Sequence, residues 1–128
     1  MVINMKGRSY PYERTILYAD KNVEVVLIEW PPGARSVAHD HGNSYGTIRV
    51  LAGMVYCDNF SKRTKRFNGR TIGRTGDILS ETSDIIHIMG NHSKSKAARA
   101  LHVYMPPLKM KTYPDSVLKF EKSSNTKK

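Results

Sequence analysis

The stretch Val23-Glu24-Val25-Val26-Leu27-Ile28-Glu29-Trp30, which ends at Pro31-Pro32-Gly33, carries the strongest secondary-structure signal of this sequence. Its β-branched and aromatic residues favour a pleated strand, and the two prolines and the glycine end that strand. Further short apolar segments, separated by turn residues, occupy residues 46–51, 54–57, 78–79, 85–89 and 100–104. Asn68-Gly69 is a dipeptide typical of hairpin turns. Short strands at close spacing, without sustained helical periodicity, predict an all-β sandwich or barrel.

The size and composition of the chain indicate one folded domain. It has 128 residues, of which 39% are hydrophobic and 25% are charged, as in ordinary globular domains. We predict a single domain over residues 1–118 and a basic polar tail over residues 119–128. No apolar run approaches the roughly 20 residues that span a bilayer, and residues 1–10 lack the apolar segment of a signal peptide. These observations predict a cytoplasmic protein without a membrane partner.

The formal net charge is +10, from 21 Lys and Arg against 11 Asp and Glu. Much of the excess lies in the tail and in residues 62–74, which contain no acid. Such charge attracts nucleic acid or small anions, but aromatic residues do not alternate with these bases as they do in single-strand binders. We therefore interpret the basic residues as a solvated hairpin and tail, without a nucleic-acid partner.

The histidines are the candidate metal ligands. Cys57 is the only cysteine, which excludes an intramolecular disulfide and a cysteine-rich zinc site. His39 and His41 are two residues apart, so on a strand both rings point to one face. His87, in a distant apolar segment, can supply a third imidazole. Taken alone, a His-x-His pair is a weak metal signal, and a histidine such as His87 is more often a hydrogen-bonded core residue.

Two glycine and histidine patterns resemble the sequence motifs of cupins. The first motif is matched by Gly33, His39, His41 and Gly53, and the second by Gly76, His87 and Asn91. The resemblance implies a single-domain cupin barrel, the double-stranded β-helix or jelly roll built from two sheets. Most metal-binding cupins have a glutamate shortly after the histidine pair, but residues 42–46 contain no acid. We therefore expect three neutral imidazoles without a carboxylate, a ligand set common to iron, zinc, nickel and copper.

Longer segments resemble the cysteine dioxygenase type I family, in the form found in bacteria. The matching segments are Tyr12-Glu13-Arg14, Trp30, His39-Asp40-His41-Gly42, His87-Ile88-Met89-Gly90-Asn91 and Leu101-His102-Val103-Tyr104-Met105-Pro106-Pro107. They span about residues 10–108, most of the chain. The resemblance implies a thiol dioxygenase, which adds both atoms of O2 to the sulfur of cysteine and yields cysteine sulfinate.

The resemblance also implies roles for individual residues. It implies that iron(II), for which nickel or zinc can substitute, is bound by His39, His41 and His87. It implies that Arg14, together with Tyr12, binds the substrate carboxylate through its guanidinium. It implies that Tyr104 lies near the metal and that His102, on the same strand face, orients the hydroxyl of Tyr104. Without the resemblance, Arg14 would be interpreted as a surface residue, and Tyr104 and His102 as buried strand residues with satisfied polar atoms.

The sequence departs from the family pattern at two positions. Gly46 stands where animal members have a cysteine that can crosslink to the active-site tyrosine, so we expect no thioether here. Ala100 stands where many members have a serine that completes a Ser-His-Tyr chain, so we expect His102 to lack that partner.

Two other functions remain open. The first is a dioxygenase for another small thiol, such as 3-mercaptopropionate; relatives of that type tend to lack the arginine, so Arg14 favours cysteine. The second is a non-catalytic metal-binding cupin that binds a small anion, against which the three histidines and Tyr104 argue.

Overall fold

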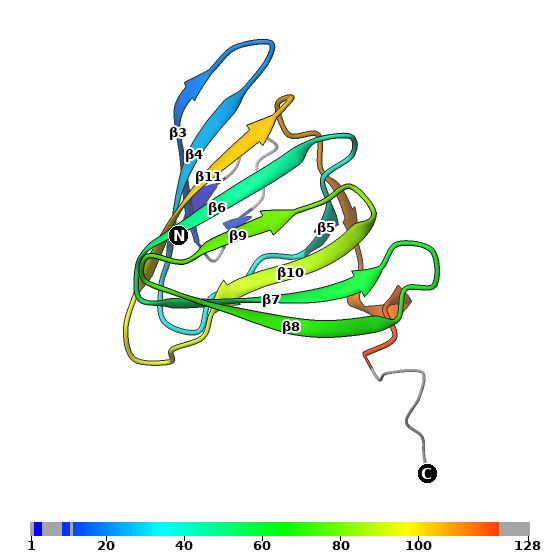
Figure 1. The fold of residues 1–128 in the computed structure, drawn as a ribbon. Helices are drawn as coiled ribbons and strands as arrows, with labels where there is room; N and C mark the ends of the chain where they lie inside the picture. Colours follow the sequence, from blue (N-terminus) through cyan, green and yellow to red (C-terminus); the bar gives the residue numbers. More distant parts are fainter. Residues whose placement is uncertain (1, 4–8, 11, 121–128) are drawn as a thin grey trace.

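The computed structural model describes residues 2–3, 9–10 and 12–120, and its main body consists of two facing antiparallel sheets (Figure 1). We call one the histidine sheet, because it carries His39 and His87; its strand order is β12-β5-β10-β7-β8. Its strands are β5 (Ala38–Asp40), β7 (Met54–Ser61), β8 (Phe67–Arg74), β10 (Ile85–Asn91) and β12 (Lys111–Tyr113). The predicted all-β class is confirmed.

We call the second sheet the tyrosine sheet, because it carries Tyr104; its strand order is β3-β4-β11-β6-β9. Its strands are β3 (Glu13–Ala19), β4 (Glu24–Trp30), β6 (Tyr45–Ala52), β9 (Ile78–Glu81) and β11 (Ala98–Met105). The remaining elements are the paired strands β1 (Val2–Ile3) and β2 (Ser9–Tyr10) and the short 3-10 helix η1 (Asp115–Val117). Within the described ranges, no helix is long and apolar enough to cross a bilayer.

The main core lies between the two sheets and follows from the two-residue period of the strands. In β4, Val26, Ile28 and Trp30 are buried, whereas the residues between them are only partly buried. They pack in one cluster with Val55 of β7 and Met89 of β10. Alternate side chains of a strand point to opposite faces. The alternation of apolar residues in β4 therefore determines which face of the strand packs into the core.

A second, smaller core lies on the outer face of the histidine sheet. Phe60, Ile86 and Ile88 point away from the main core and pack with Leu118, which directly follows η1. Phe120 adds a ring contact to Phe60, with ring centroids 5.2 Å apart. The C-terminal segment thus covers this face through residue 120, and the rest of the predicted tail, residues 121–128, lies outside the described residues.

The hairpin between β7 and β8 turns at residues 62–66, and the prediction of a turn at Asn68-Gly69 is wrong. The backbone N–H of Ser61 donates to the carbonyl of Arg66 across 3.0 Å and closes the loop. Gly69 lies inside β8, opposite Asn59 and next to a shift in the strand register, with φ of 126°. A glycine at a strand irregularity uses the same conformational freedom that a turn needs.

Candidate metal centre and substrate pocket

The three predicted histidine ligands converge inside the barrel. His39 lies in β5, His41 follows that strand directly, and His87 in β10 stands opposite His39 in the antiparallel register. The ring centroids are 5.0 Å apart for His39 and His41, 4.7 Å for His39 and His87, and 4.4 Å for His41 and His87. All three side chains are buried. Segments far apart in the sequence therefore present three imidazoles to one point.

Asp40, between the two histidines, fixes the orientation of this short strand. Its carboxylate accepts hydrogen bonds from the hydroxyl of Tyr113 at 2.6 Å and from the backbone N–H of Gly42 at 2.9 Å. These bonds attach β5 to β12 on one side and to the following turn on the other. Since neighbouring residues of a strand point in opposite directions, holding Asp40 outward keeps His39 and His41 directed inward.

A carboxylate lies among the histidines, so the expectation of a site without an acid is wrong. Oε2 of Glu81 is 2.6 Å from Nε2 of His87 and 3.0 Å from Nε2 of His41. Glu81 is the last residue of β9 and is buried. Glu81 was not predicted, because an acid was expected just after His41. The pairing of β9 with β6 brings Glu81 to the site instead. A detectable signal was an acid ending a short strand-like segment ahead of His87.

Gly46 explains why Glu81 fits. The two residues are direct cross-strand partners between β6 and β9. A Cβ atom at residue 46 would lie 2.8 Å from Oε1 of Glu81 and 2.9 Å from Cε1 of Tyr104, closer than carbon atoms are tolerated in packed interiors. The segment that lacks the usual acid, residues 42–46, thus ends at the glycine that leaves space for the carboxylate of Glu81.

These four side chains fit a divalent metal ion. One donor atom from each of His39, His41, Glu81 and His87 lies within 4.8 Å of the other three, and the Nε2 atoms of His41 and His87 are 3.0 Å apart. Donors bound at about 2.1 Å and at right angles around an ion are separated by about 3 Å. Oε1 of Glu81 is buried and finds no hydrogen-bond partner in the part of the chain that the structure describes, which suits a further contact at this centre. Imidazole and carboxylate together are accepted by several transition metals.

The protonation states of His39 and Glu81 also suit metal binding. Burial, together with the neighbouring His87 and His41, lowers the pKa of His39 to about 3, so its imidazole is neutral at physiological pH. Nδ1 of His39 donates to the carbonyl of Val37 at 2.8 Å, which leaves the lone pair on Nε2. Burial alone would raise the pKa of Glu81, but the neighbouring His87 and hydrogen bonds with the surrounding histidines hold that pKa well below its usual range. Glu81 is therefore a carboxylate.

Tyr104 and His102 form a buried pair beside the metal-binding residues. Nδ1 of His102 is 2.9 Å from the hydroxyl of Tyr104, and the rings of Tyr104 and His41 stack with centroids 5.8 Å apart. Burial and the adjacent Glu81 carboxylate hold the pKa of Tyr104 well above its usual value, so it remains a phenol. Burial lowers the pKa of His102. Among the described residues, Nε2 of His102 has no hydrogen-bond partner.

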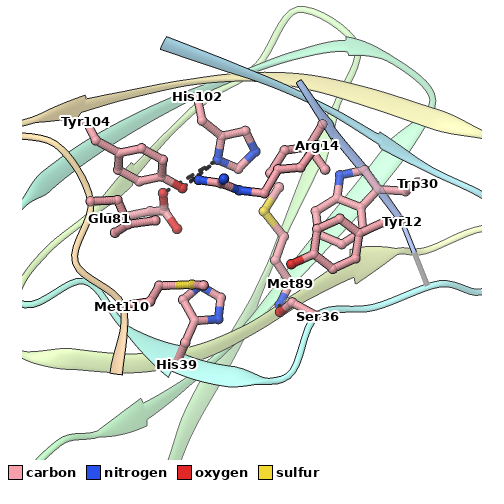
Figure 2. A pocket seen from close by; sticks show the side chains of 12 residues that line it. Tyr12, Arg14, Trp30, Ser36, His39, Glu81, Met89, His102, Tyr104 and Met110 are labelled. Carbon is pink, nitrogen blue, oxygen red and sulfur yellow. Dashed lines mark hydrogen bonds and ion pairs between the residues drawn. The ribbon is translucent and has the colours of Figure 1, made fainter. Parts of the chain in front are cut away.

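Arg14 and Tyr12 line the same cavity from the tyrosine-sheet side. Figure 2 shows the guanidinium of Arg14 directed inward beside Tyr104 and His102, with His39 and Met110 across the cavity. Tyr12 is buried against Trp30, with ring centroids 4.5 Å apart. The open volume is only about 20 Å³. The structure thus brings the predicted residues Tyr12, Arg14, His39, His102 and Tyr104 to one narrow cavity. His41 and His87 lie beside it, in one cluster with His39.

Asn91, the last residue of the second cupin-like motif, has a structural role and does not belong to the metal-binding cluster. Its side-chain amide donates to the carbonyls of Trp30 at 3.1 Å and Lys96 at 2.7 Å. Its Oδ1 accepts the backbone N–H of Ser93 at 2.8 Å. Asn91 therefore anchors the loop between β10 and β11 to the end of β4.

The fold matches solved cupin structures at low sequence identity. A protein from Klebsiella pneumoniae with a double-stranded β-helix domain has a TM-score of 0.68 and 17% identity, over 80% of this chain and 84% of that chain. A protein from Bacillus halodurans has a TM-score of 0.68 and 16% identity, over 85% and 83%. The Schizosaccharomyces pombe Cnp3 cupin domain has a TM-score of 0.64 and 11% identity, over 75% of this chain and 61% of that chain. These likenesses confirm the predicted cupin fold.

The amino-acid sequence also matches a family model. That model describes cysteine dioxygenase type I, and it matches residues 8–116. The match includes Arg14, both histidine segments, Glu81 and the strand that carries His102 and Tyr104. This chain therefore belongs to the cysteine dioxygenase type I family.

Proposed function

We propose that this chain is a mononuclear non-haem iron(II) thiol dioxygenase that converts L-cysteine and dioxygen to cysteine sulfinate. The observation that carries the proposal is that Arg14 lines the same cavity as His39 and Glu81, two members of the metal-binding cluster. A metal ion holds a thiolate, and a guanidinium matches a carboxylate. Cysteine carries both groups, separated by two carbon atoms.

The size and lining of the cavity favour a small substrate. An open volume of about 20 Å³ holds little more than one water molecule, so cysteine enters only if a side chain moves. Met110 is the side chain we expect to move, because methionine is unbranched and rotates about three bonds. Trp30 and Tyr12 form a stiffer wall and exclude bulky thiols.

The chemistry divides between the metal and the residues around it. Bound iron(II) would lower the pKa of the thiol and supply positions at which thiolate and dioxygen lie side by side. Arg14 binds and orients the carboxylate, and Tyr104, kept protonated by burial, offers a hydroxyl proton to the polar groups of the substrate. His102 holds that hydroxyl at 2.9 Å. Both atoms of dioxygen end on sulfur, the electrons that sulfur loses reduce dioxygen, and the thiol proton is released.

Glu81 favours a second candidate substrate. A carboxylate beside the three histidines occupies space around the metal that the amine of cysteine would otherwise use. A small thiol carboxylate without an amine, such as 3-mercaptopropionate, needs fewer positions around the metal and still presents a carboxylate to Arg14. Arg14 itself favours cysteine by family resemblance, so the two side chains support different substrates.

The test is anaerobic loading with iron(II), followed by addition of ¹⁸O2 and either thiol, with mass spectrometry of the product. We expect cysteine to gain two labelled oxygen atoms and to be consumed faster than 3-mercaptopropionate. Faster turnover of 3-mercaptopropionate would identify that thiol, and not cysteine, as the substrate. A metal-loaded protein that is inert towards every small thiol would instead support the non-catalytic, anion-binding cupin. His87→Ala, which lacks one metal ligand, serves as the negative control.

A further inference from the structure

The outer face of the tyrosine sheet exposes large apolar side chains. Five of them point outward from its strands, and Ile78 (62% exposed) and Tyr18 (55%) are the most exposed of these. The full set is Tyr18, Tyr45, Leu51, Ile78 and Met105. The polar residues Thr15, Thr47, Arg49 and Ser80 lie on the same face, between these side chains. Exposed apolar side chains gathered on one face of a monomer often mark an interaction site.

The centre of this face is apolar as well. Val25 and Leu27 of β4 and Leu101 and Val103 of β11 alternate with core residues and point outward, and none of the four belongs to either core cluster. An antiparallel sheet with one face in water normally carries polar residues on that face. The equivalent face of the histidine sheet is covered by Leu118, whereas the described residues place no element over the tyrosine sheet.

The two central strands match each other in a way that fits a two-fold axis. Across β4 and β11 the outward pairs are Val25 with Val103, Leu27 with Leu101, and Glu29 with Arg99. A copy rotated by 180° about a line between these strands would therefore set valine on valine and leucine on leucine. It would also set Glu29 against the partner's Arg99 at one end. A surface that meets itself in this way is the requirement for an isologous dimer.

The charges at that end form no ion pair within the described part of the chain, although Glu29 and Arg99 are cross-strand neighbours. Glu13 stands directly opposite Glu29 in the register, and like charges so placed are destabilising. No ion pair among the described residues involves Glu13, Glu29 or Arg99. All three line a hollow of about 450 Å³ together with Pro31 and Pro32. The hollow offers two carboxylates to an incoming guanidinium.

We propose that the chain forms a two-fold symmetric dimer through the outer face of the tyrosine sheet, with the partner's Arg99 entering the hollow beside Glu13 and Glu29. The axis between β4 and β11 sets four strands, β3, β4, β11 and β6, against the same four strands of the partner. Spaced about 4.8 Å apart and about 23 Å long, these strands present roughly 440 Å². Two copies would bury about 880 Å², the area of a weak interface, so the dimer should dissociate on dilution. The two metal centres remain inside their own barrels, since each is formed within one chain.

The test measures the mass of the full-length protein in solution by sedimentation and light scattering over a wide range of concentration. We expect a species of about 29 kDa, twice the chain mass of 14.5 kDa. Leu101→Glu should convert it to the monomer. The matched control is Ile72→Glu, the same kind of change at a half-buried residue on the other sheet, and it should remain dimeric. Circular dichroism and metal content check that each variant is folded.

A charge reversal identifies the orientation of the two copies. Arg99→Glu should weaken the dimer, because it places three carboxylates at one end, and the double variant Glu29→Arg with Arg99→Glu should restore it. A wild-type protein that is monomeric at every concentration overturns the proposal. So does a dimer that survives Leu101→Glu, since its interface lies elsewhere. Binding of a monomeric wild type to lipid vesicles, lost in Leu101→Glu, would assign the face to a membrane surface instead.

Discussion

Glu81 and Arg14 carry opposite charges into the same cavity, and each has a separate task. Glu81 lies within 3.0 Å of two ligand histidines, whereas Arg14 contributes to the field that acts on His102 and Tyr104. At the scale of single residues, the metal and the substrate should therefore depend on different side chains. Substitutions at the two positions can separate these dependencies.

Glu81→Gln should weaken metal binding. The substitution keeps the size of the side chain but removes the negative charge beside His41 and His87, so metal affinity should fall at least about 10-fold. Competition with a chelator measures this without reference to activity. Asp58→Asn, which removes a carboxylate on the outer face of the histidine sheet, should bind metal like the wild type. Unchanged affinity in Glu81→Gln would remove Glu81 from the ligand set.

Arg14→Ala should impair substrate binding and spare the metal. A charge-assisted hydrogen bond contributes about 1.5–3 kcal/mol, so KM for cysteine should rise roughly 10- to 100-fold. Metal content should not change. Arg74→Ala, at the exposed end of β8, is the matched control and should keep the wild-type KM. A normal KM in Arg14→Ala would show that the carboxylate binds elsewhere.

At the scale of elements, some strands that form the candidate metal site could be predicted from the sequence, and others could not. His39, His41 and His87 were predictable, because two-residue spacing in a strand and a short motif are local properties of the sequence. Glu81 was not, because its place in the site depends on the pairing of β9 with Gly46 in β6. The turn of the β7–β8 hairpin was misplaced for a related reason, since Gly69 serves a strand irregularity and not a turn.

Leu118→Ala should destabilise the fold without changing the metal centre. Leu118 is buried against Phe60, Ile86 and Ile88 on the face of the histidine sheet opposite the ligands, and truncating a buried leucine costs about 2–5 kcal/mol. The midpoint of urea unfolding should therefore fall, while metal affinity of the folded protein stays the same. Val117→Ala, at an exposed neighbour, should change stability by less than about 0.5 kcal/mol.

At the scale of the whole molecule, the metal centre joins the two sheets. His39, His41 and His87 belong to the histidine sheet and the turn after β5, whereas Glu81 belongs to the tyrosine sheet. A metal ion bound to all four residues would link the two halves of the barrel at one point. Metal binding should therefore be coupled to the stability of the entire fold.

Metal loading should raise the melting temperature. A ligand at 100 times its Kd stabilises the folded state by about 2.7 kcal/mol, which for a domain of this size corresponds to a shift on the order of 10 °C. Calorimetry with and without metal measures the shift. His87→Ala should lose most of it, and a chelator should reverse it in the wild type. An equal shift in His87→Ala would mean that the metal binds outside this cluster.

Gly46 lies so close to Glu81 and Tyr104 that a larger residue at position 46 would need space that the side chain of Glu81 now occupies. A cysteine at position 46, which the family resemblance gives for animal members, would meet the end of the Glu81 side chain and the ring of Tyr104, so one of them would have to shift. Relatives should accordingly divide into two lineages, in which a small residue at one position accompanies a large one at the other. An exchange between the lineages requires both changes together, since either alone leaves a clash or a void.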